Sequence, residues 1–217
     1  MLALEPNSVL PQPTGQCSAG VGIRVRPVHS KGDSMKVLIG YFSETGNTKQ
    51  VAETMAAKAE ELGHETDLCT TGEIQSADLG AYDVVFLGTT IHSSDVAAPV
   101  RSLLDGIPEG ARFKLAGFAT HATLMPSDEA WQTEMYETWA SKAPKTFHSI
   151  AEAKNVELLG YFHCQGAPSP PIEQFIKSTI ITDQALWDEY VDDIHKHPTA
   201  DDLTAAAVFA ADVLAKA

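Results

Sequence analysis

The chain has 217 residues and a hydrophobic fraction of 44%, which suffice for one domain with a full core and room for an insertion. Its formal net charge of -14 argues against nucleic acid or an anionic membrane surface as the main partner. An acidic surface suits a carrier that docks on basic proteins, although solubility alone also accounts for it.

The cysteine pattern and the N-terminus bear on the cellular compartment. Three cysteines, Cys17, Cys69 and Cys164, form neither a C-x-x-C pair nor a metal-ligand spacing. An odd, sparse count of this kind favours a reducing compartment with unpaired thiols. No stretch is apolar enough to span a bilayer, and the N-terminus lacks a basic start followed by an apolar run. We therefore expect a cytoplasmic protein without membrane insertion and without a metal site.

The first 34 residues differ from the rest of the chain. They are rich in Pro, Gly and Ser, show no lasting hydrophobic period, and carry basic residues in an otherwise acidic protein. This composition predicts that 1–34 is a disordered N-terminal extension. Met35 stands directly before the first strong strand, so we expect it to be the true start, with the folded domain covering 35–217.

From residue 35 onward, short apolar runs alternate with stretches of helical periodicity. The runs are typical of strands that are buried on both faces. Five strands are predicted, at 36–42, 64–70, 83–88, 113–120 and 156–164. Helices are predicted at 48–62, 98–105, 129–151 and 201–216. Pro144 is expected to end or kink the third helix.

This alternation predicts a doubly wound α/β fold, in which helices cover both faces of a parallel sheet through right-handed crossovers. Ligands of such sheets bind beyond the carboxyl ends of the strands, where the strand order reverses. Residues 165–198 interrupt the alternation before the last helix. They open with a Pro-rich segment and continue with two apolar stripes at helical spacing, so we expect an ordered insertion of two short helices.

The turn between the first strand and the first helix carries the strongest chemical signal. It reads Ser43-Glu44-Thr45-Gly46-Asn47-Thr48. Backbone N–H groups at a helix start are unpaired and, with the positive end of the helix dipole, form an anion site. Hydroxyl side chains add donors, and Gly46 permits a tight backbone. Because the turn contains no Lys or Arg, it suits a phosphate monoester and not a triphosphate with magnesium. The plain alternative is an ordinary Ser/Thr N-cap.

The segment Gly40–Thr48 resembles the FMN phosphate loop of the flavodoxin family, whose pattern is T/S-x-T-G-x-T/S, at every fixed position. The likeness continues through Tyr82–Gly88 and covers 35–163 and the final helix. It implies a flavodoxin-like, five-stranded parallel sheet of order 2-1-3-4-5. It also implies that FMN binds at the switch point between the first and third strands.

In flavodoxins, the loops after the third and fourth strands flank the isoalloxazine ring, and their backbone groups meet its pyrimidine edge and set its potential. The resemblance assigns these contacts to two segments of this chain. The first contains Thr89, Thr90, Ile91, His92 and Ser93, and the second contains Thr120, His121, Ala122, Leu124 and Met125.

Both flanking segments depart from the family pattern. His92 stands where a short-chain flavodoxin has Trp, and Ser93 stands where it has Gly. Serine adopts positive φ less readily than glycine, so we expect a weaker stabilisation of the one-electron-reduced flavin. The second segment lacks the stacking tyrosine, which leaves His121, Leu124 or Met125 to cover that face. Either histidine by itself would be read as a surface residue; beside a phosphate loop we expect flavin contact without proton transfer.

The sequence supports three functions. The favoured one is an electron carrier whose FMN serves redox partner proteins or a small electron acceptor. The second is an NAD(P)H-dependent, FMN-containing reductase of quinones or related acceptors. Gly88–His92 also resembles flavodoxin-fold quinone reductases and protoporphyrinogen oxidases, although no nicotinamide signature is present. The third is a structural or regulatory fold without flavin, against which the intact loop argues. Whether the chain forms a homodimer is left open.

Overall fold

The computed structural model describes residues 34–217. The expectation of disorder for the N-terminal extension therefore falls outside the described residues, except for Ser34. Among the described cysteines, Cys164 is free and buried. Cys69 is not a free thiol, so the expectation of unpaired thiols is wrong at that position. Within 34–217, no helix is both long and apolar enough to cross a membrane.

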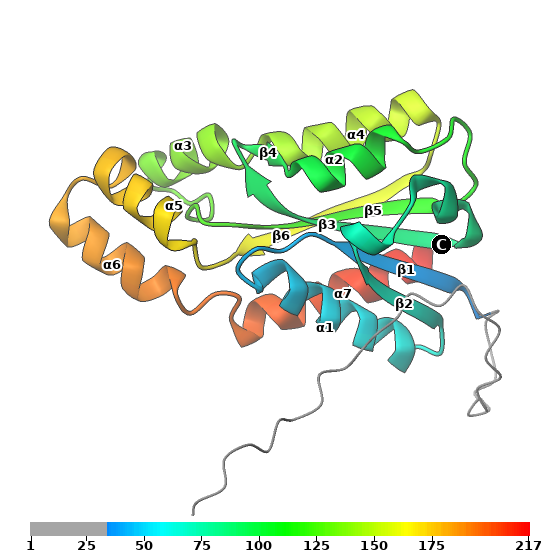
Figure 1. Ribbon diagram of the computed structural model, residues 1–217. Helices are drawn as coiled ribbons and strands as arrows, with labels where there is room; N and C mark the ends of the chain where they lie inside the picture. Colours follow the sequence, from blue (N-terminus) through cyan, green and yellow to red (C-terminus); the bar gives the residue numbers. More distant parts are fainter. Residues whose placement is uncertain (1–33) are drawn as a thin grey trace, which may run out of the picture.

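A parallel sheet of five main strands forms the centre of the molecule (Figure 1). The strands are β1 (Lys36–Tyr41), β2 (Glu65–Thr70), β3 (Val84–His92), β5 (Lys114–His121) and β6 (Leu158–Gln165). They lie in the order β2-β1-β3-β5-β6, and every neighbouring pair is parallel. The predicted fold class and strand order are confirmed, and the order reverses between β1 and β3.

Helices cover both faces of the sheet. In Figure 1, α1 (Asn47–Glu61) and α7 (Ala200–Lys216) lie below it, and α2 (Ala98–Asp105) and α4 (Lys142–Lys154) lie above it. Successive residues of a strand point to opposite faces. Val84 and Phe86 accordingly pack in the α1–α7 layer, and Val85 and Leu87 pack in the α2–α4 layer. This double burial explains the apolar runs of the inner strands β1, β3 and β5. The edge strand β2 is less apolar and partly exposed.

The predicted helix at 129–151 is wrong in detail, because the structure has two helices there. The first, α3, covers Ala130–Trp139, and α4 begins at Lys142. Pro144 lies in the first turn of α4. Proline is tolerated at that place because the N–H groups of the first turn have no intrahelical acceptor. Pro144 therefore neither ends nor kinks a helix.

The third strand extends four residues beyond its predicted end. After Gly88 the chain stays extended to His92, turns through Ser93 and Ser94, and pairs back as the antiparallel strand β4 (Asp95–Val96). Both serines have positive φ, 50° and 74°. Two consecutive residues of positive φ form the type I′ turn of a two-residue hairpin. The first flanking segment is therefore a β-hairpin and not an open loop.

Helices also occupy the stretch between β6 and α7. They are α5 (Pro170–Phe175), a π-helical turn η3 (Ile176–Ile180) and α6 (Gln184–Ile194). Two short 3₁₀ turns, η1 (Thr71–Glu73) and η2 (Ser76–Ala81), lie between β2 and β3. Residues of η3 and α6 form a third apolar cluster with Met135 of α3. In Figure 1, α3, α5 and α6 gather at the carboxyl end of the sheet.

We predict that Ser94→Gly raises the free energy of unfolding by about 1 kcal/mol. Ser94 is 3% exposed, and its hydroxyl has no hydrogen-bond partner among the described residues. Glycine removes both this unpaired group and the cost of left-handed backbone. Ser94→Ala removes only the hydroxyl, so it should gain less. Urea unfolding measures the free energy of unfolding of all three proteins, provided that the m value is unchanged. A Ser94→Gly protein less stable than the parent would contradict the left-handed backbone and the unpaired hydroxyl of Ser94.

Candidate functional site

The predicted site segments lie at or directly after the carboxyl ends of β1, β3 and β5, which are parallel strands and so end on the same side of the sheet. Two contacts join them. Thr48 and Thr120 share a hydrogen bond of 2.8 Å between their hydroxyl oxygens. Nε2 of His92 lies 2.7 Å from a carboxylate oxygen of Glu44. The structure thus brings the phosphate loop (residues 43–48) against both flanking segments.

The phosphate loop has the backbone of an anion site. Gly46 is the N-cap of α1, with φ 92° and ψ -11°, and no side chain caps the helix. The plain interpretation of a Ser/Thr N-cap therefore does not hold. The first N–H groups of α1 lack intrahelical acceptors, and no acidic residue stands in the first turn. The helix start presents unpaired donors and the positive end of its dipole.

Two loop hydroxyls keep their protons available. Oγ of Ser43 accepts from the Gly46 N–H at 3.1 Å, and Oγ1 of Thr45 accepts from the Asn47 amide at 2.8 Å. Since both oxygens are acceptors in these contacts, both O–H groups can still donate to an anion. Thr48 differs, because it is 1% exposed and bonded to Thr120. It joins two loops and is not open to a ligand.

The segment after β6 also supports the phosphate loop, which the sequence did not predict. The Asn47 amide donates to the carbonyl oxygen of Ala167 at 2.8 Å. A Cβ on Gly166 would come within 2.8 Å of that same amide nitrogen. Glycine at 166 therefore permits close approach of the two loops. The only sequence signal was a small residue directly after a strand.

The first flanking segment uses its residues mainly to build the hairpin. Thr89 is fully buried; its hydroxyl donates to the Thr90 carbonyl and accepts from the Ala97 N–H at 2.9 Å. Ile91 packs against the α2–α4 core layer. His92 is exposed, and its ring meets Phe42 edge-on at a centroid distance of 6.0 Å. Of this segment, His92 and Ser93 are exposed, so their side chains are open to a ligand or to solvent.

The second flanking segment buries its histidine. Nε2 of His121 lies 2.9 Å from Nδ1 of His163, and its Nδ1 lies 2.8 Å from the Thr123 hydroxyl. Nε2 of His163 lies 3.4 Å from the Tyr136 hydroxyl. Burial, reinforced by the neighbouring imidazole, lowers the pKa of His121 to about 3. His121 is therefore neutral at pH 7 and belongs to a polar chain behind the segment.

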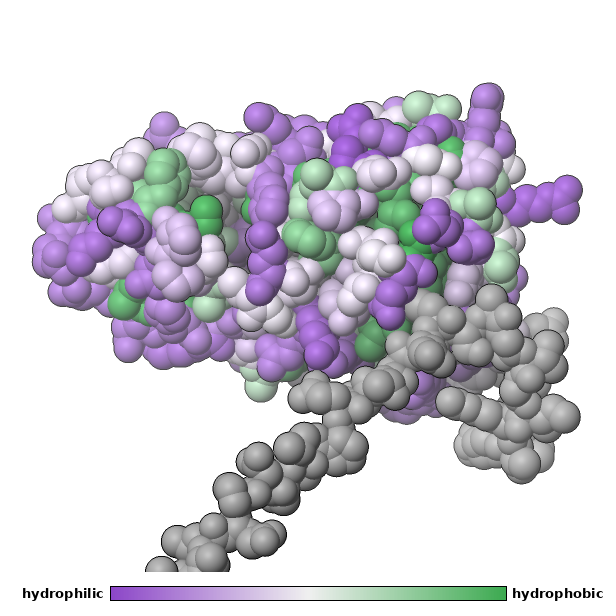
Figure 2. Space-filling model, viewed as in Figure 1, coloured by the Kyte–Doolittle hydropathy of each residue, from purple (hydrophilic) through white to green (hydrophobic). Residues whose placement is uncertain are grey.

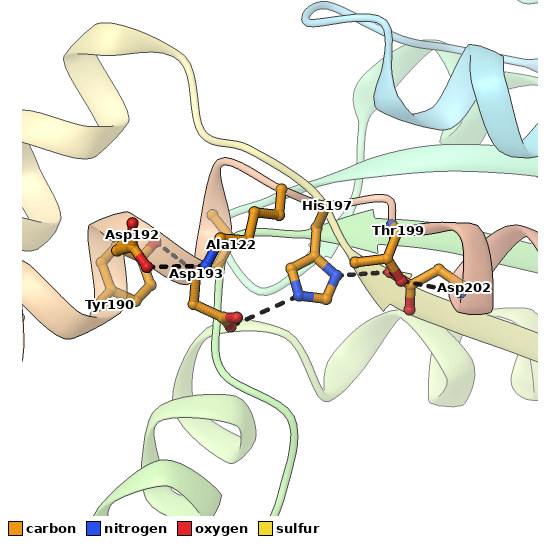
Figure 3. A network of polar contacts seen from close by, with 8 residues as sticks. Ala122, Tyr190, Asp192, Asp193, His197, Thr199 and Asp202 are labelled. Atoms are coloured by element: carbon orange, nitrogen blue, oxygen red, sulfur yellow. Dashed lines mark hydrogen bonds and ion pairs between the residues drawn. The ribbon is translucent and has the colours of Figure 1, made fainter.

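The rest of the second flanking segment contacts α6. The Tyr190 hydroxyl donates to the Ala122 carbonyl at 2.7 Å, as Figure 3 shows. Leu124 packs against the third apolar cluster, and Met125 is exposed. Among the three side chains expected to cover a flavin face, His121 is withdrawn into the polar chain, and Met125 remains accessible.

Two cavities border these segments. One, of about 610 Å³, lies between the ends of β1 and β2 and helix α2, and Ser43 lines it. The other, of about 740 Å³, lies between residues 124–132 and α6. Leu124 and Met125 line the second cavity.

Residues 38–211 match the family of flavodoxin domains. The chain belongs to the flavodoxin domain family. Its fold is similar to a flavodoxin from the domain Archaea, with a TM-score of 0.54 at 15% identity over 84% of this chain and 98% of that one. It is also similar to oxidised flavodoxin 2 from Bacillus cereus, with a TM-score of 0.56 at 17% identity over 84% and 99%. A comparison with curated protein sequences finds no match.

We predict that this flavodoxin-domain protein loses stability as the pH falls below 6.5. Burial lowers the pKa of both His121 and His163. Between pH 6.5 and about 3 the unfolded chain therefore binds more protons than the folded one. The free energy of unfolding should fall by about 1.4 kcal/mol per pH unit for a fully buried histidine.

Urea unfolding between pH 7 and 5 measures this dependence. His121→Gln should be less stable at pH 7 and should have a shallower pH dependence than the parent. His148→Gln replaces an exposed histidine and should leave the slope unchanged. Equal slopes for the parent and His121→Gln would show that His121 is not held neutral by the fold.

Proposed function

We propose that this protein binds FMN and works as an electron carrier. The observation that carries the proposal is the uncapped start of α1 behind Gly46, with the Ser43 and Thr45 hydroxyls free to donate. These are neutral donors around one anion, which suits the terminal phosphate of FMN. Bound FMN would supply the redox chemistry. The protein supplies the position and the surroundings of the ring.

The remaining site residues have supporting roles in this proposal. Backbone groups of Thr90–Ser93 and of Ala122–Met125 would flank the ring, since both segments lie at the same sheet edge as the phosphate loop. The Glu44–His92 pair ties the phosphate loop to the hairpin. A net charge of -14 favours encounter with basic redox partners. On the face drawn in Figure 2, hydrophilic residues prevail and hydrophobic ones are scattered.

The second candidate is an FMN-dependent reductase of a small acceptor. The contacts of α6 favour it. Tyr190 bonds to Ala122, and the third apolar cluster packs against Leu124, so α6 covers part of the second flanking segment. A cover on that side restricts the approach of a large partner more than that of a small molecule. The fold without flavin has no such observation in its favour.

FMN affinity of Gly46→Ala tests the phosphate loop. Alanine disfavours the positive φ of residue 46 by about 1–2 kcal/mol, so the free loop of the variant moves away from this conformation. Part of the binding free energy of FMN is then used to restore the conformation. We expect Kd for FMN to rise about tenfold. Gly63→Ala is the matched control, because Gly63 has φ 91° beyond the other end of α1 and is equally unobstructed. Flavin fluorescence titration measures both; equal effects, or no FMN binding by the parent, would contradict the proposal.

Anaerobic mixing of the FMN-loaded protein with NADH or NADPH separates the two candidates. An electron carrier should keep its flavin oxidised over the time of mixing, and a reductase should lose the yellow colour rapidly. Absorbance spectroscopy gives the result directly. Free FMN at the same concentration is the control. Rapid bleaching would contradict the function of an electron carrier and would support that of a reductase.

A further inference from the structure

The cavity of about 740 Å³ between residues 124–132 and α6 is separate from the proposed phosphate site. Among the described residues, those that line it include none of 43–48 and none of 89–93. Under the proposed function, FMN would contact both of those segments. The cavity therefore lies on the side of the second flanking segment that faces α6. Its volume is within the range of sites for small organic ligands.

The walls of this cavity combine an apolar surface with acidic groups. Leu124, Met125 and Trp131 supply apolar and aromatic surface. Four carboxylates also line it: Glu129, Glu189, Asp192 and Asp193. Lys196 lines the same cavity, but its ammonium group is bonded to Asp192 at 2.8 Å. The balance of charge disfavours anionic ligands, phosphorylated cofactors included.

Gln165, at the end of β6, adds a hydrogen-bonding group. It lines the cavity and is 6% exposed. Its Nε2 is buried without a hydrogen-bond partner among the described residues. A buried donor in this state is destabilising, and an acceptor on a ligand would satisfy it. The terminal torsion of glutamine is broad, so the amide can turn toward the cavity.

We propose that this cavity binds a small aromatic compound, uncharged or cationic, that carries a carbonyl oxygen for the amide of Gln165. Trp131 provides a face for stacking, and the carboxylates exclude anions. The compound would lie against Leu124 and Met125 and would therefore contact the second flanking segment. The proposal does not depend on FMN binding.

Three ligands of one ring frame test this chemistry. 2-Acetylnaphthalene has the carbonyl and no charge, 2-naphthoate is anionic, and 2-ethylnaphthalene lacks the acceptor. Titration of the full chain, followed by ¹H–¹⁵N NMR, should show the ketone binding at least fivefold more tightly than either of the others. It should also shift the side-chain amide resonance of Gln165. Failure of the ketone to bind, or equal binding of the anion, would overturn the proposal.

Two variants assign the preferences to residues. Gln165→Leu removes the unpaired donor without polar replacement, so it should bind the ketone and the ethyl compound alike. Glu189→Lys should tighten 2-naphthoate by at least threefold. Glu137→Lys is the charge-matched control, because Glu137 is exposed on α3 and does not line the cavity. This control should leave the affinity for 2-naphthoate unchanged. A Gln165→Leu protein that still prefers the ketone would overturn the role of Gln165.

FMN distinguishes this site from the proposed flavin site. The titrations are repeated with one equivalent of FMN and with Gly46→Ala. Ketone binding should persist in both cases, even where FMN affinity is lost. Displacement of the ketone by FMN would show that the cavity is part of the flavin site and would overturn the proposal of a separate one.

Discussion

A buried hydrogen bond between Thr48 and Thr120 joins the phosphate loop to the second flanking segment. The residues are 1% and 3% exposed, and their hydroxyl oxygens lie 2.8 Å apart. Thr48 lies in the first turn of α1, which follows β1. Thr120 lies one residue before the end of β5, which is separated from β1 in the sheet by β3. The bond fixes the phosphate loop relative to the second flanking segment. A cofactor that spans both needs this distance to be constant.

The helices between β6 and α7 are attached to the site at several places, and this makes them part of its architecture. Ala167 accepts from Asn47 in the phosphate loop. Tyr190 of α6 bonds to the second flanking segment. At the far end, His197 is 12% exposed and lies 2.6 Å from Asp202, in the first turn of α7 (Figure 3). Contacts at both ends and in the middle hold α6 over the second flanking segment.

The sequence was sufficient for the fold because the inner strands β1, β3 and β5 are buried on both faces and therefore appear as apolar runs. It was insufficient where structure depends on tertiary contacts. A Ser93-Ser94 turn lacks the Asn-Gly signature of a type I′ hairpin, so the extension of β3 was missed. The burial of His121 depends on His163 and Tyr136, which come from other elements. The local sequence does not specify which way such a side chain points.

The hairpin determines the backbone conformation of the first flanking segment. Serine at 93 was expected to resist positive φ, yet Ser93 and its neighbour Ser94 both adopt it. The conformation is held by the pairing of His92 with Asp95, and by Thr89, which accepts from the Ala97 N–H. A peptide flip at this position would have to break those contacts, because the turn and the strand pair form together. The constraint is thus the hairpin and not the serine side chain. In the proposed complex with FMN, a segment fixed in this way would offer the flavin a single hydrogen-bonding arrangement, which would favour paired electron transfer over one-electron steps.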